Sequence, residues 1–283
     1  MPYFSSRMLT LNAHAKINLG LRVLHKRDDG YHNIETVFHR IRLADEVHLS
    51  AADEITMTCD VPEIPTDGRN LCMQAALELR AHSATSAGAA IHLTKRIPAG
   101  GGLGGGSSDA AATLLGLRRL WNLSVSDKDL RAIALRLGSD VPYFLNAGTA
   151  YATGRGEELE YFRLELPYWI VVAFPGIFVS TPWAYANLEI PIRKDPSSLK
   201  EALSAYILDA GQLRTCLTND FEPVVFPRHP EIGRLKKTFY DKSAVFAQMS
   251  GSGSAVYAFF DTENSAREIS GSLGIPVSIT PPG

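Results

Sequence analysis

Hydrophobic and polar positions alternate near the N-terminus of the chain. Residues 15, 17, 19, 21 and 23 are apolar, and polar residues or glycine stand between them, which predicts a half-buried strand over residues 15–24. Asp29 and Gly30 give a hairpin-type turn signal, so we expect residues 33–43 to return as a second strand. Lys16 and Asn18 then share the strand face that lies opposite the apolar one.

A dense glycine run at residues 100–106 precedes a segment with helical spacing. Ser107, Ser108 and Asp109 follow the run and are residue types favoured at helix N-caps. Apolar residues then recur at helical spacing from Ala110 to Trp121. We therefore expect a helix that begins at these capping residues.

Further elements alternate irregularly along the rest of the chain. Ser126 and Asp129 resemble a capping box that opens a helix, and Gly138 is placed to end it. The other patterns predict a helix over 70–81, strands over 90–97, 169–174 and 255–260, and a frayed tail over 280–283. Without regular strand–helix alternation the fold class is α+β in two lobes, which we divide into residues 1–157 and 158–283.

Composition narrows the class of protein. With 28 Lys and Arg against 30 Asp and Glu, the net charge is −2, so we expect no nucleic-acid or membrane partner, since both attract strongly basic proteins. No apolar run approaches the ~18–20 residues of a membrane-spanning helix, and no signal-peptide pattern is present. Cys59, Cys72 and Cys216 form no C-x-x-C pair and are expected to be buried, reduced thiols. These features predict a cytoplasmic enzyme or small-molecule binder.

The glycine run points to an anion site. Six glycines among seven residues let the backbone turn its N–H groups toward a ligand, and the following helix N-terminus attracts negative charge. A P-loop is excluded because the chain has no Gly-Lys dipeptide. A dinucleotide fingerprint is matched by Gly100, Gly102 and Gly105, but the acids at the required distance open a helix rather than follow a strand. Protein-kinase signatures are absent.

The segment from Pro98 to Ala111 resembles the ATP loop of the GHMP kinase superfamily. Four other segments match that superfamily in the expected order, namely residues 15–19, 29–32, 138–142 and 249–253. The resemblance implies a lobe similar to domain 2 of ribosomal protein S5 followed by a ferredoxin-like lobe. Within the superfamily, the motifs are similar to those of a small-molecule kinase that phosphorylates the 2-hydroxyl of a CDP-linked methylerythritol, in the non-mevalonate route to isoprenoids.

The resemblance also implies the catalytic residues. Asp140 would be the general base that takes the proton of the acceptor hydroxyl, and Lys16 its electrostatic partner. From the residues alone, Asp140 could equally be an N-cap before Pro142, and Lys16 a solvated strand lysine. The Gly251–Gly253 turn would pack its backbone against this site.

Ligand contacts follow from the same resemblance. The nucleotide would be held by a set of loop and pocket residues: Pro98, Ala99, Gly100, Gly101, Gly102, Leu103, Gly104, Gly105, Gly106, Ser107 and Ser108 around the phosphates, and Asn70, Leu71 and Lys95 around the adenine. Mg²⁺ would arrive with ATP rather than in a dedicated cage, with Ser108 and Asp140 as its candidate contacts.

The acceptor would be held by a smaller set of residues. Asn18 would meet its hydroxyls, Tyr31 would stack on the cytosine and His32 would bond the edge of the base. Tyr185 would cover the other face of the cytosine, with Trp183 as the rival. Read without the resemblance, Tyr31 and His32 flank a turn, and either second-lobe aromatic could be a core residue.

Three other functions stay open at this point. A mevalonate- or homoserine-type kinase would lack a nucleobase for Tyr31 to stack on. A nucleotide-binding regulator would be expected to have lost Lys16 or Asp140, and an NAD-dependent oxidoreductase is the most distant reading. For the leading interpretation we expect a small-molecule substrate and a monomer or weak homodimer.

Overall fold

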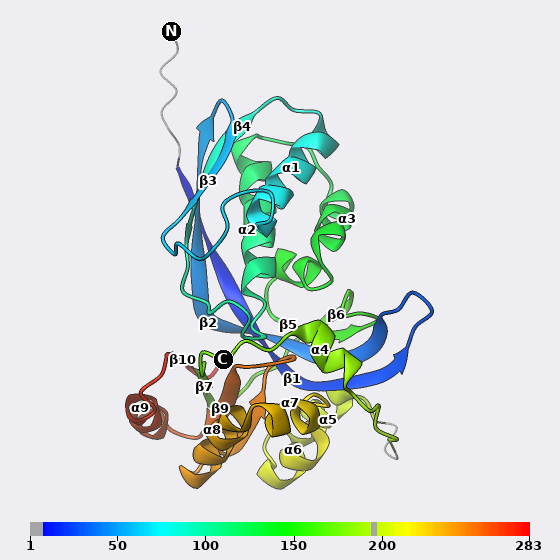
Figure 1. The fold of residues 1–283 in the computed structure, drawn as a ribbon, viewed down its shortest axis with the longest axis vertical. Helices are drawn as coiled ribbons and strands as arrows, with labels where there is room; N and C mark the ends of the chain where they lie inside the picture. The colour runs from blue at the N-terminus through cyan, green and yellow to red at the C-terminus, as the bar shows by residue number, and fades with distance from the viewer. Residues whose placement is uncertain (1–7, 194–196) are drawn as a thin grey trace. The chain divides into compact units, whose positions relative to one another are not determined.

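The computed structural model describes residues 8–193 and 197–283 (Figure 1). They form two compact units, each drawn from several stretches of the chain. Unit 1 contains residues 8–15, 44–97 and 104–147, and unit 2 contains residues 16–43 and 98–103 together with the described residues from 148 onward. The units are thus discontinuous in sequence, and a single boundary at residue 157 stays a prediction.

Two long strands, β1 (Leu9–Lys26) and β2 (His32–Ala52), pair with each other and contribute residues to both units. They confirm the strands expected at 15–24 and 33–43 but are longer. In unit 1, β4 (Gly88–Thr94) pairs antiparallel with β2 and parallel with β3 (Ile55–Cys59). In unit 2, β5 (Thr149–Thr153) pairs antiparallel with β2 and with β6 (Glu158–Phe162).

Helices α1 (Leu71–Ser83), α2 (Gly105–Leu120) and α3 (Asp127–Leu137), with the 3₁₀ turn η1 (Val141–Leu145), pack on one side of the strands of unit 1 (Figure 1). The apolar stripes of the helices and the inner faces of the strands form one core, which includes Leu49, Leu79, Ile91, Leu114 and Ile133. Burial of these side chains holds α2, and with it the end of the glycine loop, on the sheet.

The helix termini test the capping predictions. Ser126 caps α3 by accepting a hydrogen bond from Asp129 N, and α3 ends at Gly138, as expected. The predicted start of α2 was wrong, because its N-cap is Gly104 rather than Ser107, Ser108 or Asp109. Gly104 adopts φ +71°, so the helix begins within the glycine run and the three polar residues already lie inside it.

The second sheet lies entirely in unit 2 and consists of β7 (Trp169–Ala173), β8 (Phe246–Met249), β9 (Val256–Phe260) and β10 (Val277–Thr280). Its spatial order β10-β7-β9-β8 is antiparallel throughout and is the order of a ferredoxin-like fold. Helices α4 (Thr181–Ala186), α7 (Glu222–Arg228), α8 (Pro230–Asp241) and α9 (Glu263–Ser272) contribute to its core, while α5 (Leu199–Tyr206) and α6 (Ala210–Cys216) complete the unit.

Two smaller expectations are corrected. The tail is not frayed, because Thr280 belongs to β10 and Gly283 exchanges two backbone hydrogen bonds with Leu166, at 2.9 and 3.2 Å. All three cysteines are free, but only Cys72 is buried, whereas the other two are half-buried. Within the described ranges, no helix combines the length and apolarity needed to cross a membrane.

Candidate active site

Lys16 lies buried on β1 at the centre of a polar cluster in unit 2. Its ammonium donates to Asn18 Oδ1 at 2.7 Å and to the Gly102 carbonyl at 3.2 Å, and it stands 5.0 Å from the centre of the Phe38 ring. Asn18 in turn donates to Thr36 Oγ1 on β2 at 2.9 Å. Because Lys16 is only 4% exposed, its reading as a solvated strand lysine was wrong. The side chain is instead held against the glycine loop.

The middle of the glycine loop is anchored in unit 2 through its carbonyl groups. Gly101 O accepts from Ala255 N at 3.1 Å, Gly102 O accepts from Ser250 Oγ at 3.0 Å, and Leu103 O accepts from Lys16 N at 3.0 Å. The turn that contains Ser250 therefore lies against the loop, as expected for the last sequence motif. Gly102 must be glycine, since it adopts φ +73° and a Cβ there would stand 2.1 Å from Ser250 O.

The amide groups of the loop differ from its carbonyl groups in their hydrogen bonding. Among the described residues, no backbone N–H of residues 100–106 donates a hydrogen bond within the protein. Gly104 O accepts from Ser108 N as the first turn of α2 forms, so the free N–H groups of the loop continue into those of the helix terminus. Such a row of amides, with the helix dipole behind it, is suited to bind phosphate.

Ser108 and Lys95 are less available to a ligand than their sequence positions suggested. The buried Ser108 hydroxyl donates to His14 O at 2.7 Å, which leaves only its lone pairs for a cation or donor. The Lys95 ammonium is enclosed by Asp45 and Asp109, at 3.1 Å from the latter.

The other two residues expected around the adenine lie near the start of α1. Asn70 caps this helix by accepting from Cys72 N, and its amide donates to Pro65 O. Leu71 lies beside the loop, with its Cδ1 3.7 Å from the point where a Cβ on Gly106 would be. An adenine role for Asn70, Leu71 and Lys95 stays a prediction.

Aromatic side chains expected at the acceptor are found together in unit 2. His32 and Tyr185 stack with ring centres 4.9 Å apart, and Tyr185 meets Phe221 edge-on. Tyr31 is 58% exposed, with the Arg155 guanidinium 5.0 Å from its ring centre. Burial and the nearby Lys26 lower the pKa of His32, which favours a neutral imidazole that can both donate and accept.

For Trp183 and for the expected catalytic residue Asp140, the structure tests only part of the expected role. Trp183 packs edge-on against His229, so Tyr185 is the aromatic that joins His32. Asp140 occupies the N-cap position of η1, just before Pro142, as the alternative reading expected, but its side chain makes no capping hydrogen bond. Asp140 belongs to unit 1 and Lys16 to unit 2, and their joint role stays a prediction.

No group of three or more His, Cys, Asp or Glu in residues 8–193 and 197–283 could hold a metal ion.

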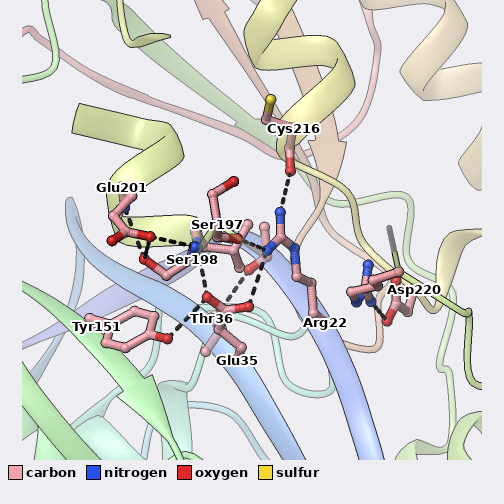
Figure 2. A network of polar contacts seen from close by, with 12 residues as sticks. Arg22, Glu35, Thr36, Tyr151, Ser197, Ser198, Glu201, Cys216 and Asp220 are labelled. Carbon is pink, nitrogen blue, oxygen red and sulfur yellow. Dashed lines mark hydrogen bonds and ion pairs between the residues drawn. The ribbon is translucent and has the colours of Figure 1, made fainter. Parts of the chain in front are cut away.

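A buried ion pair beside the Lys16 cluster was not foreseen from the sequence (Figure 2). Arg22 on β1 donates to Glu35 on β2 at 3.2 Å, and also to the carbonyls of Ser197 and Cys216. Glu35 accepts further bonds from the Tyr151 hydroxyl at 3.0 Å and from a backbone amide of α5. Burial and this carboxylate raise the pKa of Tyr151 to about 12. The pair fixes the strand next to Thr36, and only the alternation of polar residues on β1 hinted at it.

Two family models match the chain, one described as GHMP kinases N terminal domain over residues 70–148 and one as GHMP kinases C terminal over residues 197–276. The fold and the amide-lined loop therefore define a GHMP kinase.

Related proteins show to which family of GHMP kinases the chain belongs. The chain is 46% identical over 280 residues to a protein of Chlorobium phaeobacteroides (strain BS1), with 97% of each chain covered, and 47% identical over 266 residues to one of Prosthecochloris aestuarii, with 91% of each covered. Both are named 4-diphosphocytidyl-2-C-methyl-D-erythritol kinase. A crystal structure of 4-(cytidine 5'-diphospho)-2C-methyl-D-erythritol kinase superposes with a TM-score of 0.82 at 34% identity, covering 97% of this chain and 99% of that one. The chain belongs to the family of these kinases.

Proposed function

We propose that this protein transfers the γ-phosphoryl group of ATP to the 2-hydroxyl of 4-diphosphocytidyl-2-C-methyl-D-erythritol, a step of the non-mevalonate route to isoprenoid precursors. The observation that carries this proposal is the 46% identity over 97% of the chain to a relative named for that substrate. The hydroxyl oxygen attacks the γ-phosphorus, the bond to the β-phosphate oxygen breaks, and ADP leaves.

Phosphate binding is assigned to the amides of the glycine loop and the first turn of α2. The carbonyls of Gly101, Gly102 and Leu103 are bonded to the protein, whereas the loop amides donate to none of the described residues, which supports this role. Lys16 supplies a positive charge beside the loop, where it stabilises charge on the transferred group. Mg²⁺ bound with ATP would neutralise part of the phosphate charge, and the lone pairs of Ser108 could hold it without a carboxylate cage.

The acceptor is assigned to the side of the molecule that carries the aromatic residues. Asn18 meets the hydroxyl groups of the methylerythritol, His32 bonds the edge of the cytosine, and Tyr31 and Tyr185 stack on the base. The existing stack of His32 on Tyr185 supports an aromatic platform for a nucleobase. A mevalonate- or homoserine-type acceptor has no ring for such a platform. A cytoplasmic location and a monomeric or weakly dimeric state stay predictions.

A direct assay tests the substrate. The purified protein is incubated with Mg-ATP and, separately, with the CDP-linked alcohol, mevalonate or homoserine, and ADP release is followed. We expect release with the CDP-linked alcohol alone. Release only with mevalonate or homoserine would refute the proposed acceptor.

Asp140 is assigned as the base that accepts the proton of the 2-hydroxyl. Asp140→Asn keeps the size of the side chain and removes its basicity, so we expect kcat to fall by ~10²–10⁴ with little change in the KM for ATP. Asp127→Asn, at a side chain that is 92% exposed, is the matched control and is expected to keep wild-type kcat. An unchanged kcat in the Asp140 variant would remove this residue from the role.

A further inference from the structure

Three ionisable side chains from different elements meet in the interior of unit 1. Lys95, just after β4, places its ammonium against the carboxylates of Asp45 on β2 and Asp109 on α2, with 3.1 Å to Asp109 Oδ2. The side chains of Asp45, Lys95 and Asp109 are 0%, 8% and 4% exposed. The sequence singled out Lys95 as an adenine contact and Asp109 as part of the loop motif but did not bring the three residues together, and neither the phosphate site nor the proposed base uses the cluster.

The cluster joins the two ends of the glycine loop. Asp45 Oδ1 accepts from the backbone amides of Arg96 and Ile97, the latter at 2.7 Å and immediately before the loop. At the other end Asp109 stands in the first turns of α2, and a Cβ on Gly105 would be only 2.9 Å from the Lys95 ammonium. One ammonium between two carboxylates therefore fixes where the loop starts and where the helix begins.

The charge balance of the cluster depends on Asp109. Two carboxylates face one ammonium, and Asp109 Oδ1 is buried with no hydrogen-bond partner among the described residues. Burial raises the pKa of Asp109 to about 8, with Lys95 opposing and Asp45 reinforcing the rise. Another titratable group that faces it is the thiol of Cys72 on α1, whose pKa burial raises to about 12. The raised pKa and the unpaired Oδ1 both point to a protonated Asp109 beside the Lys95 ammonium.

We propose that Asp109 is a positioning residue for ATP, which sets the start of α2 through Lys95 and must be uncharged there while the triphosphate is bound. This inference rests on the proposed function, because it takes residues 98–108 as the ATP loop. An ionised carboxylate in the first turns of α2 cancels part of the helix dipole and repels the phosphates. It also leaves two carboxylates with one ammonium between them, and this excess negative charge loosens the contact that holds the loop.

The test compares wild type, Asp109→Asn and Asp109→Ala, with Asp127→Asn as the exposed control, by steady-state kinetics from about pH 7 to about pH 9. For wild type and the control we expect the KM for ATP to rise about tenfold at about pH 9, since only about a tenth of the molecules then retain a neutral Asp109. Asp109→Asn keeps the shape without the charge, so its KM stays level over this range. Asp109→Ala loses the bond to Lys95, and its KM is about 10–100-fold higher at every pH while kcat changes little.

The results of these measurements distinguish a failure of the inference about Asp109 from a failure of the proposed function. Parallel KM profiles for wild type and Asp109→Asn, with normal turnover, overturn the inference alone. A wild-type protein that releases no ADP from ATP with the CDP-linked alcohol overturns the proposed function and the inference with it. If Asp109→Ala does not fold, the level profile of Asp109→Asn decides the matter, because a merely structural carboxylate would not change the pH dependence of the KM.

Discussion

Replacing Gly102 by alanine perturbs the middle of the glycine loop without changing any charge. Gly102 adopts φ +73°, and a Cβ at this position would stand 2.1 Å from the carbonyl oxygen of Ser250 and 3.1 Å from that of Gly253. Both neighbours are backbone atoms of one turn, so neither can swing aside as the end of a side chain could. The substitution therefore forces the loop or the turn to move.

The size of that movement follows from the same contact. Real Cβ atoms essentially never approach another heavy atom within 3.0 Å, so the backbone must shift by about 0.9 Å, the difference between 3.0 and 2.1 Å. A misplacement of about 1 Å in a site that aligns reacting groups lowers the rate by on the order of 100-fold. We expect a loss of that order in kcat/KM for ATP.

Gly176→Ala is the matched control. Gly176 also adopts φ +73°, but no atom lies within 4 Å of its Cβ position, so the variant bears only the cost of a left-handed alanine, about 1–2 kcal/mol. ADP release and thermal unfolding are measured for both variants. A large loss of kcat/KM in Gly102→Ala but not in Gly176→Ala, with the larger loss of stability also in Gly102→Ala, would support the reasoning. Equal kcat/KM values in the two variants would refute it.

Two further predictions concern stability. Glu35→Ala leaves the buried Arg22 without its carboxylate and should lower the free energy of unfolding by about 3–5 kcal/mol, whereas Glu165→Ala removes an exposed pair and should cost less than about 1 kcal/mol. Urea unfolding compares the two, and equal losses would contradict the prediction. Burial lowers the pKa of His39 from 6.5 in the unfolded chain to about 4 in the folded protein. Between these two pH values the unfolded chain binds more protons, so the free energy of unfolding falls as the pH drops from 6.5 to about 4. The loss is on the order of 3 kcal/mol. His39→Gln should lose this component, and an unfolding free energy with the same acid dependence in both proteins would argue against it.

Local and periodic features of the fold were predictable from the sequence. The alternation around Lys16 predicted β1 and placed Lys16 and Asn18 on one face, where their side chains do bond at 2.7 Å. The cap at Ser126 and the end of α3 at Gly138 followed from residue preferences within one helical turn. Such signals are readable because each depends on neighbours a few positions away.

Features that depend on distant partners were not predictable in this way. Lys16 meets Gly102 across 86 positions, and the Ser250 hydroxyl lies beside Asn18 across 232 positions. The tail resembled a frayed end because its pairing with Leu166 has no local signature. The start of α2 was missed for a different reason, since N-cap preferences favour serine and aspartate over a glycine whose left-handed conformation only the folded loop requires.

The phosphate binding proposed for the glycine loop does not require the lysine of a P-loop. Hydrogen bonds from Ala255, Ser250 and Lys16 hold three successive carbonyls toward the protein, whereas the loop amides donate to none of the described residues. The chain has no Gly-Lys dipeptide to add a positive charge from within the loop. The Lys16 ammonium lies on β1, 3.2 Å from Gly102 O, so under the proposed function one residue would both anchor the loop and lower the electrostatic cost of bringing a triphosphate to it.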